Sequence, residues 1–146
     1  MPNNEHTTPA PLFDTLHHEF DFTLDAAATA ANAKCARYFS QEDSAFDHPW
    51  SAAERVWLNP PYGRGELDRW LAYAKQQPAL VVALIPADTS TTWWHRHIWD
   101  EVGHHPRTGV SVRFVRGRVK FSDADTGAKF GSAVVIFWGT ETGEHP

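Results

Sequence analysis

The chain has 146 residues, of which 42% are hydrophobic and 21% charged, and its formal net charge is −5 at pH 7. This size indicates one domain over 1–146, with a core of about 10–138 between polar ends. The negative charge argues against a protein that coats nucleic acid over its whole surface, and it allows only a local basic patch.

Cysteine and histidine usage narrows the class of protein further. The single Cys35 excludes a disulfide within the chain. The histidines are scattered without metal-binding spacing, so the sequence predicts no metal site. No apolar run reaches the roughly 18 residues that cross a bilayer, and the first residues do not resemble a signal peptide. We therefore expect a cytoplasmic location and no membrane partner, while the oligomeric state stays open.

The first half of the chain predicts short elements. A helix is expected from about Leu12, followed by a brief buried strand over 22–24 that ends at Asp25. The small residues of 26–33 are expected to open a second helix. The apolar run 56–58 is the next predicted strand.

The second half has clearer periodicity. Residues 66–77 predict an amphipathic helix whose apolar face consists of Leu67, Trp70, Leu71 and Ala74. Residues 80–85 are apolar on both faces, which is typical of a central parallel strand. A helix at about 92–102 and strands at 110–121 and 132–138 follow. The alternation predicts an α/β fold with a mostly parallel sheet, and the two closing strands predict an antiparallel hairpin at one edge.

The tetrapeptide Asn59-Pro60-Pro61-Tyr62 follows the strand at 56–58. Successive prolines fix φ near −65° and remove two backbone donors, so the carbonyl groups of Asn59 and Pro60 are free to accept hydrogen bonds. The Asn59 side-chain oxygen and the Pro60 carbonyl can hold the hydrogens of a planar exocyclic amine, while the Tyr62 ring stacks on the heterocycle. The alternative is an ordinary turn that closes a strand. The tetrapeptide resembles motif IV, [DNS]PP[YFW], of amino-methyltransferases that act on adenine, cytosine or glutamine amide nitrogen.

Several ordered blocks, from about residue 8 to 138, together resemble the small phage-type DNA N-6-adenine methyltransferase family: Thr8-Pro9, 22–28, 59–64, 84–89 and 117–121. The resemblance implies a compact Rossmann-like, S-adenosylmethionine-dependent methyltransferase fold. It also implies methyl transfer from S-adenosylmethionine to the N6 amine of adenine in DNA, by a phage or prophage protein in a bacterial host. RNA adenine or a glutamine amide as target, or a catalytically silent DNA-binding derivative of the fold, stay open as alternatives.

The same resemblance implies a set of cofactor-binding residues. Asp25 matches the acid that can meet the ammonium group of the methionine moiety, with a helix N-cap as the alternative. Thr8 matches a residue that binds the cofactor carboxylate, with a simple helix cap as the alternative. Ala26 begins an alanine-rich segment where a glycine-rich cofactor loop is usual, and Asn59 is expected to border the cofactor. Asp43 lies near the distance of a ribose-binding acid, or is a solvated loop residue.

Other residues are expected to contact DNA. Because an adenine amine is inaccessible inside a duplex, the base must be flipped or single-stranded. Trp93, Trp94 and His95 are candidates for the pocket wall or for a wedge that fills the gap, with a buried helix face as the alternative.

A basic stripe is expected on the predicted ribbon over 112–121. Arg116, Arg118 and Lys120 would share one face by alternation, which predicts phosphate contacts. An edge strand protected by charge is the competing interpretation.

Overall fold

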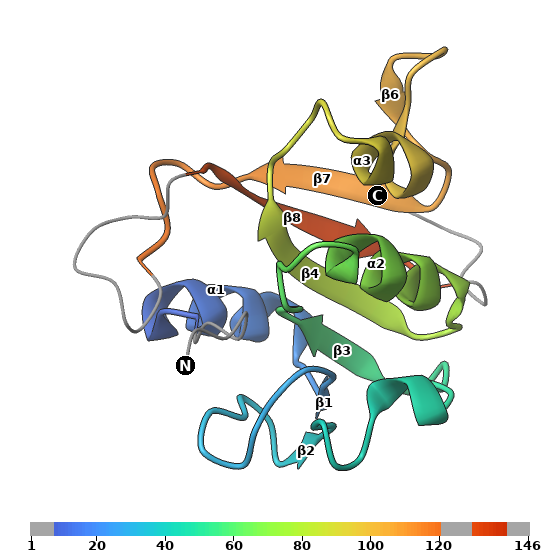
Figure 1. The fold of residues 1–146 in the computed structure, drawn as a ribbon. Helices are drawn as coiled ribbons and strands as arrows, with labels where there is room; N and C mark the ends of the chain where they lie inside the picture. The colour runs from blue at the N-terminus through green and yellow to red at the C-terminus, as the bar shows by residue number, and fades with distance from the viewer. Residues whose placement is uncertain (1–7, 121–129, 140–146) are drawn as a thin grey trace.

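The computed structural model describes residues 8–120 and 130–139 (Figure 1). The helical elements are α1 (Ala10–Phe20), the short 3-10 helix η1 (Ala45–Asp47), α2 (Glu66–Gln76) and α3 (Thr92–His97). The strands are β1 (Leu24–Asp25), β2 (Arg37–Tyr38), β3 (Arg55–Leu58), β4 (Leu80–Pro86), β5 (Trp99–Asp100), β6 (His105–Pro106), β7 (Val110–Phe114) and β8 (Ser132–Phe137).

The main sheet has six strands in the order β2-β1-β3-β4-β8-β7. The strands β2, β1, β3 and β4 run parallel to one another, whereas β8 is antiparallel to both β4 and β7. The mostly parallel sheet and the antiparallel pair at one edge are therefore confirmed. The strands β5 and β6 form a separate antiparallel pair.

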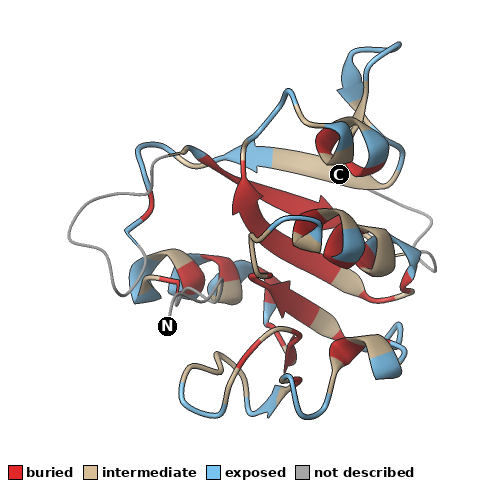
Figure 2. Ribbon diagram, in the orientation of Figure 1, coloured by how far each residue is buried: buried red, intermediate tan, exposed pale blue. Residues whose placement is uncertain are grey.

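The central strands β3, β4 and β8 are buried along most of their length (Figure 2), and hydrophobic clusters that include residues of α2 and of α1 cover the two faces of the sheet. Because successive side chains of a strand point to opposite faces, neighbours such as Trp57 and Leu58 enter different cores. Trp57 packs with Phe13 and Leu16 of α1 in one hydrophobic cluster, and Leu58 packs with Leu71 of α2 in the other. None of the helices within 8–120 and 130–139 is long and apolar enough to cross a membrane.

The predicted amphipathic helix and central strand are confirmed. In α2 all four residues of the expected apolar face are buried, and α2 follows Gly65, whose φ of 80° suits a residue without a Cβ. The strand β4 lies between β3 and β8, and its side chains from Val81 to Pro86 are all buried. Burial on both faces explains why its sequence is apolar throughout.

The prediction of a helix over 26–33 is wrong. Residues 26–33 form turns and bends, in which the Asp25 carboxylate accepts a hydrogen bond from the backbone N–H of Lys34. Thr29 and Asn32 also bond each other's backbone N–H groups through their side chains. Side chains that bond to nearby backbone compete with helix formation. The resulting loop returns the chain to β2, which the sequence did not predict.

Two other predicted elements are shorter than expected. The helix predicted over 92–102 ends at His97, after which the chain enters the β5–β6 pair. The strand predicted over 110–121 ends at Phe114, because β8 begins at Ser132, opposite the end of β7, and offers no further strand partner.

Candidate functional site

The carboxyl ends of three neighbouring parallel strands meet at one edge of the sheet. The strand β1 ends at Asp25, β3 ends directly before Asn59, and β4 ends at Pro86. In open sheets of this kind ligands bind outside the carboxyl ends of the strands. The three strand ends predicted from the sequence therefore lie where a site is expected.

Asn59 lies at the centre of this edge and is only 9% exposed. Its Nδ2 donates a hydrogen bond to the Thr8 hydroxyl oxygen at 3.1 Å. The Tyr62 hydroxyl lies 3.1 Å from Asn59 Oδ1 and 2.8 Å from the carbonyl oxygen of Leu84, so its proton can be donated to either acceptor. Burial raises the pKa of the Tyr62 phenol far above its usual range, which keeps that proton in place. The fold thus brings Thr8, Asn59 and Tyr62 together across distant parts of the chain.

Asp25, at the end of the neighbouring strand β1, is also buried. Its two carboxylate oxygens accept hydrogen bonds from the backbone N–H groups of Ala27, at 3.3 Å, and Lys34, at 2.9 Å. Burial raises the pKa of Asp25 to about 6, against the opposing effect of those two N–H groups and the Lys34 charge. Asp25 therefore caps a loop rather than the helix that the sequence suggested, and it remains mostly ionised at neutral pH.

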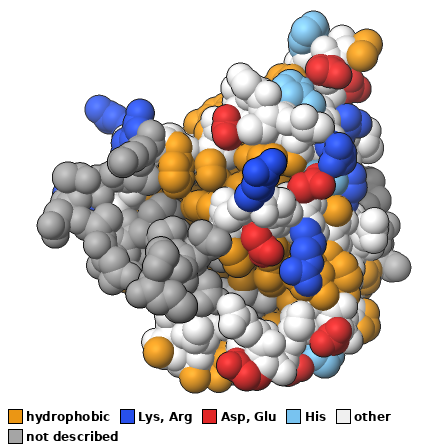
Figure 3. Space-filling model, in the orientation of Figure 1, with side chains coloured by type: hydrophobic (Ala, Val, Ile, Leu, Met, Phe, Trp, Pro, Cys, Tyr) orange, Lys and Arg blue, Asp and Glu red, His pale blue; other side chains and the backbone are white. Residues whose placement is uncertain are grey.

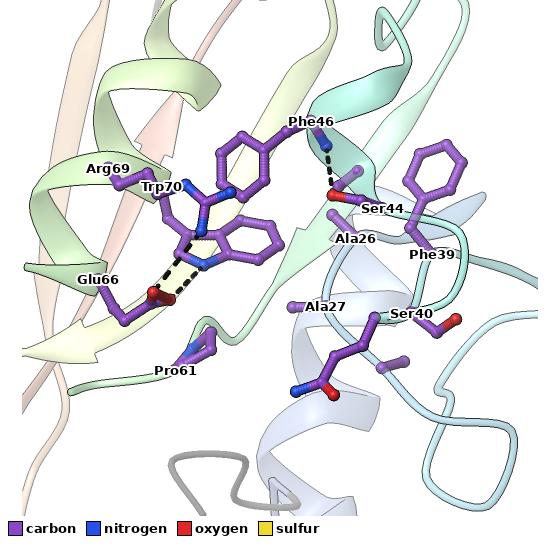
Figure 4. Close-up of a pocket in the computed structure, with 13 residues that line it drawn as sticks. Ala26, Ala27, Phe39, Ser40, Ser44, Phe46, Pro61, Glu66, Arg69 and Trp70 are labelled. Atoms are coloured by element: carbon purple, nitrogen blue, oxygen red, sulfur yellow. Dashed lines mark hydrogen bonds and ion pairs between the residues drawn. The ribbon is translucent and has the colours of Figure 1, made fainter.

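A cleft of about 260 Å³, which we call the alanine cleft, opens between this loop and α2 (Figure 4). Residues 26–28 and Phe39 line one side, and Phe46, Pro61 and Trp70 are also among its walls. The rings of Phe46 and Trp70 lie 4.5 Å apart between centroids. Small alanine side chains leave the cleft open, while the two aromatic rings, tilted by 55° to each other, give it an apolar wall.

A second cleft, the tyrosine cleft, has a volume of about 420 Å³. Tyr62, Pro86, Asp88, Trp93 and Phe130 are among its lining residues, together with 63–65 from the turn before α2. The rings of Tyr62 and Phe130 meet edge to face, with centroids 5.8 Å apart. Since Pro61 lines the alanine cleft and Tyr62 lines the tyrosine cleft, the Pro-Pro-Tyr turn stands between the two.

The three residues predicted to face DNA, Trp93, Trp94 and His95, lie in different environments. Trp93 lines the tyrosine cleft, whereas Trp94 is only 2% exposed and belongs to the core of the α2 side. A ring nitrogen of His95 lies 2.7 Å from the carbonyl oxygen of Thr89, outside the tyrosine cleft. The pocket-wall interpretation therefore suits Trp93, and the buried-face interpretation suits Trp94.

Asp43 does not line the alanine cleft. Its carboxylate lies 2.7 Å from a ring nitrogen of His48, and both residues line a neighbouring cleft with Arg37. The ring of His48 stacks on Phe39, which separates the two clefts by lining both. From the turn that carries Asp43, it is Ser40 and Gln41 that reach the alanine cleft.

The predicted basic ribbon is wrong in its conformation. Arg116, Arg118 and Lys120 are all exposed, but they follow the end of β7 in a segment without strand structure. Gly117 has a φ of 75°, which turns the chain and breaks the alternation between faces. Phe121, the last residue of the expected ribbon, lies outside the described residues.

Sequence reasoning missed several residues that line the clefts. Phe46 lies in a short 3-10 helix that no periodicity revealed, and Phe130 lies between the strands predicted over 110–121 and 132–138, in no predicted element. Trp70 was assigned to the core face of α2, which is correct, but its ring also borders the alanine cleft. Arg64, two residues after Tyr62, is exposed at the tyrosine cleft. An unusual count of seven tryptophans was the one compositional sign of such aromatic walls.

Comparison with known proteins identifies the family of the chain. Residues 3–143 match the family described as DNA N-6-adenine-methyltransferase (Dam). A DNA N-6-adenine-methyltransferase of Escherichia phage T1 is 29% identical over 130 residues, which cover 83% of this chain and 55% of the phage protein. The chain thus spans about half the length of this curated relative. Since the family match extends over nearly the whole sequence, the chain belongs to the DNA N-6-adenine-methyltransferase family.

Proposed function

We propose that the protein transfers a methyl group from S-adenosylmethionine to the N6 amine of adenine in DNA, within one compact Rossmann-like domain over 1–146. The observation that carries this proposal is the Asn59-to-Tyr62 turn, which stands at the carboxyl edge of the sheet between two clefts. A methyl donor and an acceptor base need adjoining sites that meet at the acceptor nitrogen.

The alanine cleft suits the cofactor by the chemistry of its walls. Phe46 and Trp70 offer apolar rings to the adenine, and residues 26–28 allow the ligand to approach the backbone closely. Asp25 and Thr8 are not among the residues that line this cleft, although Asp25 directly precedes Ala26 in its wall. The buried Asp25 carboxylate would attract the ammonium group of the cofactor, and the Thr8 hydroxyl would bind the cofactor carboxylate. S-adenosylmethionine, when bound, supplies the methyl group from its sulfonium sulfur, which leaves as a neutral thioether.

Asn59 and Pro60 would hold the acceptor nitrogen. The adenine amine is a weak nucleophile because its lone pair is delocalised into the purine. Hydrogen bonds from its N–H groups to Asn59 Oδ1 and to the Pro60 carbonyl favour a more pyramidal nitrogen and fix its direction. The same oxygens stabilise the positive charge that develops on nitrogen during the transfer.

The tyrosine cleft would receive the flipped or single-stranded base. Tyr62, Trp93 and Phe130 offer ring surfaces there, and base–aromatic contacts tolerate any sequence. The exposed Arg116, Arg118 and Lys120 favour a nucleic acid over a peptide amide, because phosphates attract a cluster of cations. Bacterial DNA as substrate would place the protein in the cytoplasm of the host.

Replacement of Asn59 tests this function most directly. We expect Asn59→Ala to abolish methylation of adenine-containing DNA while the S-adenosylmethionine dissociation constant stays within about twofold, since Asn59 is assigned to the amine. Methyl incorporation and calorimetric titration on the same preparation measure both quantities. Asn59→Asp is the matched control, because it keeps an acceptor oxygen and should retain activity.

The opposite pattern would overturn the assignment. A variant Asn59→Ala that loses cofactor binding but keeps its turnover would put this residue on the cofactor. Wild-type protein that binds S-adenosylmethionine yet modifies no adenine in single-stranded or duplex DNA would reject the proposed substrate.

A further inference from the structure

The hydrogen bond between Thr8 and Asn59 joins the segment before α1 to the turn after β3. Both residues are buried, Thr8 at 2% and Asn59 at 9% exposure, and the bond spans 51 positions of sequence. The Tyr62 hydroxyl meets the other end of the same amide, at Oδ1. The Asn59 side chain is therefore contacted at its nitrogen end by Thr8 and at its oxygen end by Tyr62.

The direction of this amide decides what it can bind. A carboxamide carries an acceptor oxygen at one end and a donor NH2 at the other, and the two ends have nearly the same shape. A half-turn of the side chain would replace Oδ1 with two N–H donors on the Tyr62 side. An amine held there would then face donors instead of an acceptor, and its hydrogen bond would be lost.

We propose that Thr8 is a positioning residue that fixes the Asn59 amide with its oxygen on the Tyr62 side. This inference rests on the proposed function, because it assigns the Asn59 oxygen to the target amine. The Thr8 hydroxyl oxygen accepts the Nδ2 proton and so holds the nitrogen end away from Tyr62. Asn59 Oδ1 has two lone pairs, so it can accept from Tyr62 and from the target amine together.

The same hydroxyl keeps its own proton available. A threonine hydroxyl that accepts one hydrogen bond can also donate one, and the family resemblance assigns that donor to the cofactor carboxylate. Thr8 would then contact cofactor and Asn59 at once. If Thr8 acts on the cofactor alone, removal of its hydroxyl should change only cofactor affinity. If Thr8 also holds Asn59, removal of the hydroxyl should change the Asn59 amide and kcat as well.

The test compares Thr8→Val, which keeps the shape but has no hydroxyl, with Thr8→Ser, which keeps the hydroxyl. In the ligand-free protein, the Asn59 side-chain N–H signals are identified by 15N NMR as those that vanish in Asn59→Ala. We expect Thr8→Val to raise their exchange with water at least tenfold, and Thr8→Ser to leave it within about threefold of wild type.

Kinetics supply the second measurement. At saturating S-adenosylmethionine we expect Thr8→Val to lower kcat about 10- to 100-fold, the scale of one lost hydrogen bond to a reacting group, and Thr8→Ser to restore it. Melting curves identify any unfolded variant, and Thr8→Ala replaces Thr8→Val if the latter does not fold.

Two results would overturn the proposal. Unchanged Asn59 N–H exchange in Thr8→Val would mean that Thr8 does not hold the amide. An unchanged kcat with a raised cofactor dissociation constant would confine Thr8 to cofactor binding. Should the wild-type protein fail to methylate adenine at all, the proposed function falls, while the NMR comparison still decides whether Thr8 sets the amide.

Discussion

The Asp25 carboxyl is buried, yet two backbone N–H groups of the following loop point at it. Burial dominates and raises its pKa to about 6. Because this pKa is raised, the group stabilises the ligand-free fold fully only below its unfolded pKa of 3.8, and that contribution is lost as the pH rises through about 6. Burial favours the neutral form of Asp25, whereas a bound ammonium group favours the ionised carboxylate.

We therefore predict that the affinity for S-adenosylmethionine is nearly constant above pH 7 and falls about tenfold per pH unit below about 6, as Asp25 becomes protonated. Binding near pH 6 should release a proton. Titration calorimetry in buffers of different ionisation enthalpy measures both effects.

Asp25→Asn is the control for this pH profile, since it removes the charge and keeps an oxygen for the loop. The variant should bind the cofactor more weakly by about 1.5–3 kcal/mol at pH 7.5, the scale of a lost charged hydrogen bond, and show no dependence on pH near 6. If the variant melts at a lower temperature but binds as tightly as wild type, Asp25 serves only the loop.

At the scale of elements, the segment after β7 concentrates three exposed cations in a chain of net charge −5. We predict that replacing Arg116, Arg118 and Lys120 together with Gln weakens DNA binding about equally for all sequences. The slope of log affinity against log salt should fall by up to about 2–3, because each phosphate contact releases close to one counterion. Fluorescence anisotropy at several salt concentrations measures the slope.

A second group of basic residues provides a control for this triple replacement. Lys75, Arg96 and Arg107 lie where α2, α3 and the end of the β5–β6 pair come together. Burial lowers the pKa of Lys75, and the nearby Arg107 and Arg96 charges lower it further. Figure 3 shows several Lys and Arg side chains among Asp and Glu on the face that carries α2 and α3. The same triple change to Gln at these positions should affect the slope less. If only this second variant lowers the slope, DNA contacts α2 and α3 rather than the segment after β7.

At the scale of the whole molecule, one hydrophobic cluster packs α2 against one face of the sheet, and the other packs α1 against the opposite face. Trp57 is 1% exposed, and its ring meets those of Phe13 and Phe22 at 5.3 and 5.5 Å between centroids. Trp57 thereby packs α1, which follows Thr8, against the face of β3 on which its own side chain lies.

We predict that Trp57→Ala lowers the free energy of unfolding by about 3–5 kcal/mol, from lost burial and the cavity left behind. Trp93→Ala is a matched control, because its ring is only partly buried at the rim of a cleft and its loss should cost much less. Urea denaturation compares the two variants. Equal losses would mean that α1 is not held mainly through Trp57.

Much of this fold could be predicted where one periodicity dominates. The apolar run of β4 and the 3.6-residue pattern of α2 require no tertiary information, and the position of Asn59 at a strand end follows from the apolar run 56–58 of β3. The 26–33 loop could not be predicted, because its alanines favour a helix. The pairing of β2 with β1, which requires a loop there, leaves no signal in the local sequence.

The candidate site was predictable only in part for the same reason. The Asn59-to-Tyr62 turn is contiguous, so its residues were found together. The contacts of Asn59 with Thr8, and of Tyr62 with Leu84, join segments far apart in sequence, and neither pattern nor composition specifies them. The wall formed by Phe46 and Trp70 likewise depends on how η1 packs against α2.

The place of β8 in the sheet has a consequence for how the protein is made. The strand β8 lies between β4 and β7 and pairs with both, although both precede it in the chain. During synthesis, β4 therefore keeps one open edge, and β7 has no partner among the described strands of the main sheet, until residue 137 has left the ribosome. Open strand edges invite pairing with other chains, so a nascent chain stalled before β8 would be the form most prone to aggregate and most in need of a chaperone.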